Sequence, residues 1–335
     1  MKISASLYSN KDRSIEELVR DLDQHRVDTF HIDCNDEMAV FDDIKKIREI
    51  SKTPIDLHII SSEPEKYYDL INEYQIEYVQ FQFENIQRPL KVPENGITHY
   101  GLSIMSDTPI EVFETYKDRF QFILLMTTVP GLSGGKFRKD NFRKIRKFRN
   151  TFPGKHIYVD GGVNDEVSFI LRYMGVHSVV SGSYLVNHQS IGAAMINLRI
   201  ESTKSEYQIK DFMIDFEDLP VLDYAQASFA QVLNTIDKYK LGFAFFTGAD
   251  GKFMGLASNA DVRKGLLKNL DDLNKTSLGD IVNNSPATIS QEATITQMLE
   301  LVQSKKFPVN FLPVLDNKGF IAGAVTFFNM IKSES

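Results

Sequence analysis

The sequence predicts an α/β protein in which a (β/α)8 barrel is followed by a smaller α+β region. Three observations lead to this prediction. Apolar runs of strand length alternate with helical patterns through about the first 200 residues, which is typical of a parallel sheet built from βα units. These runs number eight, as a closed (β/α)8 barrel requires. Beyond about residue 200 the order of elements changes, and one arrangement of parts occurs twice.

The elements of the barrel can be placed in order along the chain. The predicted strands are Lys2–Leu7, Thr29–Asp33, Ile55–Ile59, Tyr78–Gln82, Thr98–Ile104, Phe120–Met126, His156–Asp160 and Ser178–Ser181. Residues 14–25 and 137–152 carry apolar residues at helical spacing on a charged background, so we expect helices that cover the barrel. The connection after the fourth strand holds Pro89 and Pro93, so any helix there is short or absent.

The second region follows a polar stretch, residues 201–212, which we interpret as a linker. This interpretation places an N-terminal domain at 1–200 and a C-terminal domain at 213–335. Two segments of the C-terminal domain, 229–267 and 295–332, share the order helix, strand, turn, strand and helix, which indicates an internal repeat. Their alignment pairs Gly255 with Gly323, Ser258 with Thr326, and Asp261 with Asn329.

The composition argues against several classes of protein. Hydrophobic residues at 42% and charged residues at 25% are typical of a soluble globular protein, and no apolar run is long enough for a membrane span. The net charge of -7 argues against a nucleic-acid partner, whose phosphates require a basic surface. The first residues become charged too early for a signal peptide, and the single cysteine, Cys34, agrees with a reducing compartment. We therefore expect a cytoplasmic protein.

Ionisable residues stand where three of the predicted strands end. His31 and Asp33 end the second strand, His58 lies near the end of the third, and Asp160 ends the seventh. The carboxyl ends of barrel strands form one rim, where barrel enzymes keep their sites, so we expect these four to converge. Two imidazoles and two carboxylates suit a divalent ion such as Zn²⁺, Mn²⁺, Fe²⁺ or Co²⁺. Any one of them alone is more often a hydrogen-bonded polar cap.

Glycine-rich turns follow the sixth, seventh and eighth predicted strands. Their sequences are "PGLSGGK", "DGG" and "SGS". Glycine lets backbone N–H groups approach a phosphate closely, and the loops after the last two strands of a barrel commonly bind one. The candidate phosphate-binding residues are Gly131, Gly134, Gly135, Gly161, Gly162, Gly182 and Ser183.

About the first 200 residues resemble the ribulose-phosphate 3-epimerases, a family of TIM barrels. The matching pieces are "KISASL", "HID" with Asp36, "DLH", "LLMTTVPGLSGGKF", "VDGG" and "SGS". The resemblance implies an isomerase of carbohydrate metabolism that converts D-ribulose 5-phosphate to D-xylulose 5-phosphate in the pentose phosphate pathway. In such a reaction a metal stabilises the enediolate as a Lewis acid while two carboxylates exchange the C3 proton.

Carried to this sequence, the resemblance assigns a role to each rim residue. It implies that His31, Asp33, His58 and Asp160 are metal ligands and that the two aspartates are also the acid/base residues. The residues that it implies for substrate binding, besides the glycine-rich turns, are Ser6, His58 and Met126.

The chain also departs from the pattern of that family. Asn35 and Glu37 replace a methionine and a glycine after the second strand, and the loop that follows is shortened to "MAVFDD". Ile60 stands where the family has a sulfur-bearing residue, and Gln82 stands where it has a histidine. These departures leave a second hypothesis open, in which an altered or inactive barrel serves as a sugar-phosphate-binding or regulatory module.

The internal repeat resembles a tandem pair of CBS domains, through "GLASNAD" and "GAVTFFN". In that family the hydroxyl and the acid bind the phosphate and ribose of adenine nucleotides. The resemblance therefore implies nucleotide binding by Ser258, Asp261 and Thr326, with Asn329 in place of the second acid. A pair that only dimerises remains the alternative. We expect a homo-oligomer in either case.

Overall fold

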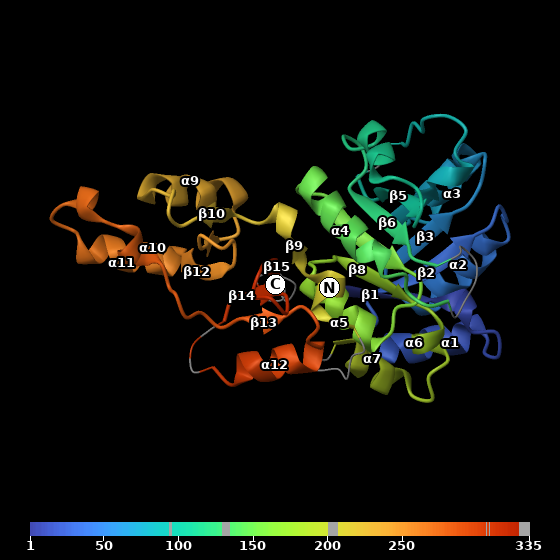
Figure 1. Cartoon of the computed structure of the whole chain (residues 1–335). Helices are drawn as coiled ribbons and strands as arrows, with labels where there is room; N and C mark the ends of the chain where they lie inside the picture. Colours follow the sequence, from blue (N-terminus) through green and yellow to red (C-terminus); the bar gives the residue numbers. More distant parts are fainter. Residues whose placement is uncertain (94–95, 129–134, 200–206, 306, 308, 328–335) are drawn as a thin grey trace. The chain divides into compact units, whose positions relative to one another are not determined.

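The computed structural model describes the chain except for residues 94–95, 129–134, 200–206, 306, 308 and 328–335 (Figure 1). The described residues form two compact units, one before residue 200 and one after residue 206. The predicted linker lies partly outside the described residues. Its remainder includes helix α8 (Ile209–Phe212), which belongs to the second unit. The domain boundaries proposed from the sequence stay a prediction.

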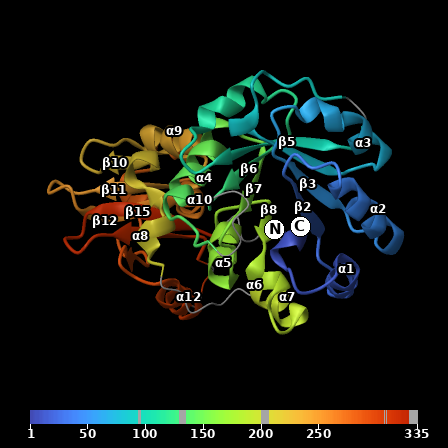
Figure 2. The ribbon, with the colours of Figure 1, turned by 90° about the vertical axis from the view of Figure 1, so that its right-hand side faces the viewer.

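The first unit is a closed barrel of parallel strands in the order β1 to β8, with helices outside it (Figure 2). Each predicted strand is present, and its ends agree with the prediction within two residues. The strands are β1 (Lys2–Ser6), β2 (Thr29–Cys34), β3 (Ile55–Ile59), β4 (Tyr78–Gln82), β5 (His99–Met105), β6 (Phe122–Met126), β7 (His156–Asp160) and β8 (Ser178–Ser181). The prediction of a (β/α)8 barrel is confirmed.

Local sequence signals explain where the barrel helices begin. Helix α1, for example, starts with a capping box in which Ser14 accepts from the Glu17 N–H and the Glu17 side chain accepts from the Ser14 N–H. Among the described residues between β4 and β5, the only helical turn is Phe83–Asn85, as Pro89 and Pro93 predicted. The helices of this unit are α1 (Ile15–Gln24), α2 (Val40–Ile50), α3 (Tyr68–Glu73), α4 (Asp140–Thr151), α5 (Asp165–Tyr173), α6 (Ser183–Val186) and α7 (Ile191–Arg199).

Apolar and polar side chains are unevenly distributed around the interior of the barrel. Strands β6 to β8 contribute a buried cluster that consists of Phe122, Leu124, Met126, Tyr158 and Val180. Most of the buried polar side chains of the strands belong to β1 to β5; they include Ser4, His31, Asp56, His58, Gln80, Gln82 and Ser103. Buried polar groups are costly unless they are hydrogen-bonded, so these side chains need partners within the barrel.

The second unit contains the two repeats, each with its own sheet. Phe243 pairs with Ser258 in the first and Phe311 with Thr326 in the second, so the strand registers agree with the alignment. The elements of the first sheet and its helices are β10 (Val221–Asp223), α9 (Phe229–Tyr239), β11 (Phe243–Thr247), β12 (Phe253–Ser258), α10 (Asn259–Lys268) and α11 (Leu278–Ile281).

The second repeat has β13 (Ile289–Ser290), α12 (Ile295–Gln303), β14 (Phe311–Leu315) and β15 (Ile321–Thr326), and its sheet also includes β9 (Ile214–Asp215) from the start of the unit. Gly255 and Gly323 show how each sheet accommodates a segment from outside its own repeat. A Cβ on Gly255 would lie 2.6 Å from the carbonyl oxygen of Asn283, and one on Gly323 would lie 2.5 Å from that of Ile214. Each repeat thus packs against the segment that leads into the other, and glycine is required where the backbones meet.

Candidate metal and active site

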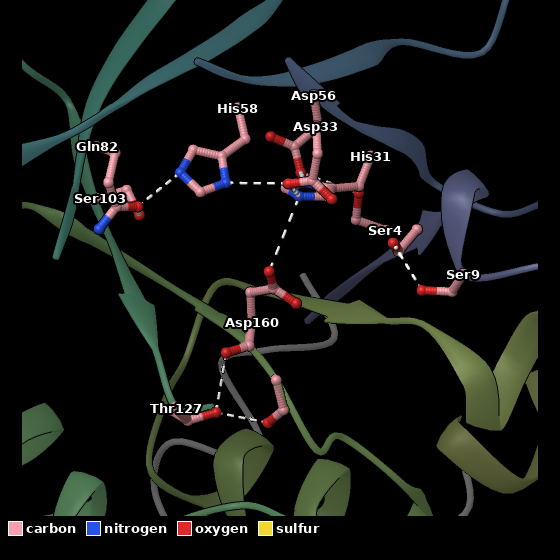
Figure 3. A network of polar contacts seen from close by, with 12 residues as sticks. Ser4, Ser9, His31, Asp33, Asp56, His58, Gln82, Ser103, Thr127 and Asp160 are labelled. Carbon is pink, nitrogen blue, oxygen red and sulfur yellow. Dashed lines mark hydrogen bonds and ion pairs between the residues drawn. The ribbon is translucent and has the colours of Figure 1, made fainter. Parts of the chain in front are cut away.

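Three of the predicted metal ligands converge at the rim of the barrel (Figure 3). Asp33 Oδ1 lies 3.3 Å from His31 Nε2 and 3.2 Å from His58 Nδ1. One ligand atom from each residue lies within 4.8 Å of the other two. Both imidazoles are buried, whereas the Asp33 side chain is 19% exposed. Strands β2 and β3 therefore present two nitrogens and one oxygen around a single point.

The fourth predicted ligand, Asp160, approaches this point from β7. Its Oδ2 lies 3.9 Å from His31 Nε2 (Figure 3). The backbone of Asp160 is held by Thr127, whose N–H donates to the Asp160 carbonyl oxygen at 2.7 Å and whose hydroxyl donates to the same oxygen at 2.9 Å. The strand end that carries Asp160 is thereby fixed to the end of β6.

Each of the two histidines has a second ring nitrogen, which points away from the rim and also has a buried partner. His31 Nδ1 lies 2.9 Å from Asp56 Oδ2, which accepts from Ser4 Oγ at 3.0 Å as well. His58 Nε2 lies 2.8 Å from Gln82 Oε1. Histidines that bind metals almost always donate their second nitrogen to such an oxygen. The residues present therefore fit a divalent ion, both in their donor atoms and in the groups that support them.

The ionisable groups of the site perturb one another. Burial disfavours a protonated His31, but the carboxylates of Asp56 and Asp33 outweigh burial and hold the pKa of this imidazole well above its ordinary value. Burial also opposes ionisation of Asp33, but His31 and His58 hold its pKa well below the ordinary value. Burial, to which the charge of Asp33 adds, raises the pKa of Asp160 to about 6 against the opposing effect of His31. The two carboxylates thus differ in how readily they carry a proton.

The glycine-rich turns pack against one another beside the site. Gly161 and Gly162 have φ of +112° and +66°. A Cβ on Gly162 would lie 2.3 Å from the backbone nitrogen of Phe137, and one on Gly161 would lie 2.4 Å from Thr128 Oγ1. The turns after β6 and β7 can therefore approach this closely only because these residues are glycines.

The remaining candidates for substrate binding lie at the ends of β1, β6 and β8 or outside the described residues. Gly182 lies against Ser9, whose hydroxyl is 3.0 Å from that of Ser6 at the end of β1. Ser183 begins α6, while Gly135 contacts Thr128 and Met126 lies buried at the end of β6. The predicted residues Gly131 and Gly134 lie outside the described residues.

Several residues of the site were not among those predicted. Asp56 lies two positions before His58 on β3, so the period of two along a strand is a signal that could have found it. The Thr127 hydroxyl donates to a backbone carbonyl oxygen, and no sequence pattern indicates such a contact. Gln82 was noted only as a departure from a family pattern, whereas the structure gives it a hydrogen bond to His58.

The predicted nucleotide-binding residues have a structural role in the second unit. Ser258 and Asp261 form a capping box at the start of α10, in which each backbone N–H donates to the other side chain. The Ser258 hydroxyl also donates to Asp261 Oδ2 at 2.5 Å. Thr326 ends β15, and Asn329 lies outside the described residues. Nucleotide binding by these side chains stays a prediction.

Comparison with known proteins decides the family of the barrel. The model of the ribulose-phosphate 3 epimerase family matches residues 2–186. The chain belongs to the ribulose-phosphate 3-epimerase family. The CBS domain model matches residues 278–334. The sequence-based prediction of an epimerase-family barrel joined to a CBS region is confirmed.

Relatives of the chain include two named ribulose-phosphate 3-epimerase. The one from Methanocaldococcus jannaschii is 26% identical over 231 residues, which is 63% of this chain and 97% of the relative. The one from Bacillus subtilis is 24% identical over 213 residues, 59% of this chain and 98% of the relative. A solved structure of CBSX2 in complex with AMP has 22% identity and a TM-score of 0.32, and the match covers 38% of this chain and 96% of that one. No helix in the described parts of the chain is long and apolar enough to span a membrane.

Proposed function

We propose that this chain is a divalent-metal-dependent 3-epimerase of a ketose phosphate, and that D-ribulose 5-phosphate and D-xylulose 5-phosphate are its substrate pair. The observation that carries the proposal is the convergence of His31, Asp33 and His58 at the rim. In each histidine, the ring nitrogen that points away from the rim lies beside a buried acceptor. Family membership supports the same chemistry.

The proposed metal ligands are His31 Nε2, His58 Nδ1 and the carboxylates of Asp33 and Asp160. Their mixture of nitrogen and oxygen donors suits Zn²⁺, Mn²⁺, Fe²⁺ or Co²⁺. When bound, such an ion supplies a Lewis acid that stabilises negative charge on the C2 and C3 oxygens of the ketose. The buried partners Asp56 and Gln82 hold the two imidazoles in place for it.

Two carboxylates can exchange the proton at C3. Asp33 comes from β2 and Asp160 from β7, and both side chains are partly exposed at the rim, at 19% and 18%. One carboxylate takes the proton from one face of C3, and the other returns a proton to the opposite face, so that the configuration at C3 is inverted. Reversal of the two roles gives the reverse reaction.

The phosphate of the substrate is proposed to lie on the backbone of the glycine-rich turns. Gly161 and Gly162 follow β7, and Gly182 precedes the short helix α6. Barrels commonly bind a phosphate at the loops after strands seven and eight. The position of these glycines directly after β7 and β8 supports the proposal.

The experiment has two steps. The metal content of the purified protein is measured first, and C3 epimerisation of D-ribulose 5-phosphate is assayed next. Asp160→Asn and Asp33→Asn serve as inactive variants, and Asp118→Asn, which changes an exposed aspartate, serves as their matched control. Bound metal without turnover on any ketopentose or ketohexose phosphate would contradict the proposal and favour a binding or regulatory barrel.

We further propose that the CBS pair binds an adenine nucleotide through Ser258, Asp261 and Thr326 and thereby regulates the barrel. The repeat and the CBS family match support this role. Calorimetric titration of the whole chain with AMP, ADP and ATP tests it. Heat that is lost in an Asp261→Ala variant supports the proposal, and no heat with any of the three nucleotides contradicts it.

A further inference from the structure

The buried side chain of Gln82 has partners that fix its direction. Its amide nitrogen donates to the carboxylate of Glu84, which can only accept, so Nε2 faces Glu84. The amide oxygen therefore faces the barrel interior. There Oε1 accepts from the Ser103 hydroxyl at 2.8 Å and lies 2.8 Å from His58 Nε2 (Figure 3).

Glu84 is itself anchored. Its Oε1 accepts from the Met105 N–H at 2.9 Å and from the hydroxyl of Thr108. A rotated Gln82 amide would place its oxygen against the Glu84 carboxylate and its NH₂ against the His58 ring and the Ser103 hydroxyl. The observed direction gives the Gln82 amide nitrogen, the Ser103 hydroxyl and the His58 ring an acceptor each, so these hydrogen bonds have one arrangement.

This direction determines which nitrogen of His58 carries hydrogen. An amide oxygen accepts and does not donate, so Nε2 of His58 must be the donor. The lone pair of a neutral ring is then on Nδ1, which lies 3.2 Å from Asp33 Oδ1 at the proposed metal site. His31 on the neighbouring strand has the opposite arrangement, because Asp56 accepts at Nδ1 and leaves Nε2 toward the rim.

We propose that Gln82 is a positioning residue: it sets the tautomer of His58 and so presents Nδ1 to the metal. This inference rests on the proposed function, because it concerns the same site. Position 82 is one where the family resemblance places a histidine. A histidine could either donate or accept there, whereas the glutamine imposes one direction on its neighbour.

Three variants test the inference. Gln82→Leu removes the acceptor, and Gln80→Leu is its matched control, because Gln80 lies two residues earlier on β4, is equally buried and has no hydrogen-bond partner for either amide atom among the described residues. The double variant Gln82→Glu with Glu84→Gln exchanges amide and carboxylate. It restores an acceptor for His58 and a donor between positions 82 and 84, so it should rescue the loss.

The first measurement is ¹⁵N NMR of histidine-labelled, metal-free protein at alkaline pH, with His58→Ala to assign the resonance. We expect hydrogen on Nε2 of His58 in the wild type, in Gln80→Leu and in the double variant, and a mixture of tautomers in Gln82→Leu. The second measurement is the dissociation constant for Zn²⁺ by competition with a chelator. We expect Gln82→Leu to weaken it about 10- to 100-fold, the usual effect of losing such a partner.

The outcomes separate this inference from the proposed function. Hydrogen on Nδ1 and a bare Nε2 in the wild type would overturn the inference without any variant, even if Gln82→Leu does not fold. Zn²⁺ binding that is equally tight in wild type and Gln82→Leu would also overturn it while leaving the proposed function intact. A wild type that binds no divalent ion would contradict the proposed function, whereas the tautomer measurement would still decide the role of Gln82.

Discussion

Two histidines lie together at the rim of the barrel and two stack at its lower end, and the surroundings of the two pairs differ. The rim pair, His31 and His58, lies among carboxylates with ring centroids 5.9 Å apart. The lower pair, His156 and His177, stacks at 3.9 Å with an interplanar angle of 3° where β7 and β8 begin. Burial lowers the pKa of His177 to about 4, and His156 and Lys2 add to this effect.

The comparison teaches that the surroundings, and not the imidazole, decide what a histidine does. At the rim, buried acceptors take one nitrogen of each ring and leave the other for a ligand. At the lower end, burial lowers the pKa of both stacked rings, and the positive charge of Lys2 adds to this effect. In a (β/α)8 barrel the first arrangement belongs to function and the second to stability. Four predictions sharpen or break this contrast.

The largest effect is expected at the proposed acid/base residues of the rim. Asp160→Asn keeps the shape of the side chain but cannot exchange a proton, so kcat for C3 epimerisation should fall about 10²- to 10⁴-fold. His177→Phe, a change at the lower end, should leave kcat within about twofold. Equal losses in the two variants would show that the ends of the barrel do not have separate roles.

The next effect concerns metal binding by the histidines themselves. His31→Ala removes a proposed ligand, so the affinity for Zn²⁺ should fall by more than about 100-fold, beyond the effect of losing an outer partner. His156→Ala should leave it unchanged. Competition with a chelator measures the Zn²⁺ affinity of both variants. Weaker binding in His156→Ala alone would place the metal at the lower end of the barrel and contradict the prediction.

A smaller effect is expected in the pH dependence of stability. The pKa of His177 is about 4 in the folded chain and about 6.5 when unfolded, so the unfolded state binds more protons between these values. The contribution of the neutral ring is fully present above pH 6.5 and is lost as the pH falls toward 4. Because the side chain is partly exposed, we expect about 1 kcal/mol.

Urea unfolding at pH 7.5 and pH 5 measures the contribution of His177 to the unfolding free energy as a difference between variants. His177→Phe keeps an aromatic ring in the stack and should show a smaller loss of unfolding free energy on acidification than the wild type. His188→Phe, a change at an exposed histidine, should behave as the wild type. A loss in His177→Phe as large as in the wild type would contradict the prediction.

The smallest effect on the barrel is expected from the second unit. Ser258→Ala removes the N-cap of α10, which should cost about 1 kcal/mol in the stability of that unit. The metal content and the thermal transition of the barrel should not change. Differential scanning calorimetry resolves this, and a shift of every transition together would show that the two units unfold as one.

Much of the fold and of the rim could be predicted from the sequence, because those signals are local. Eight apolar runs gave eight strands, and a polar residue at the end of a strand faces the rim whatever its neighbours are. The partners of those residues could not be predicted in this way. His31 stands opposite Asp56, and Gln82 opposite Ser103, only through the register between neighbouring strands.

The second unit shows the same division. The alignment of the repeats paired Gly255 with Gly323, and their equivalent places in the two sheets agree with it. The reason for the glycines is tertiary, since the backbone that touches each one comes from the segment leading into the other repeat. No pattern within one repeat contains that information.

The sequence by itself therefore determined the strands, the barrel and the identity of the rim residues. The tertiary structure alone decided which nitrogen of each histidine faces the rim, because that depends on whether Asp56 or Gln82 accepts from the other nitrogen. The physical reason is that alternation along a strand fixes the side on which a residue lies. The partner of a hydrogen bond is fixed only when the neighbouring strands come into register.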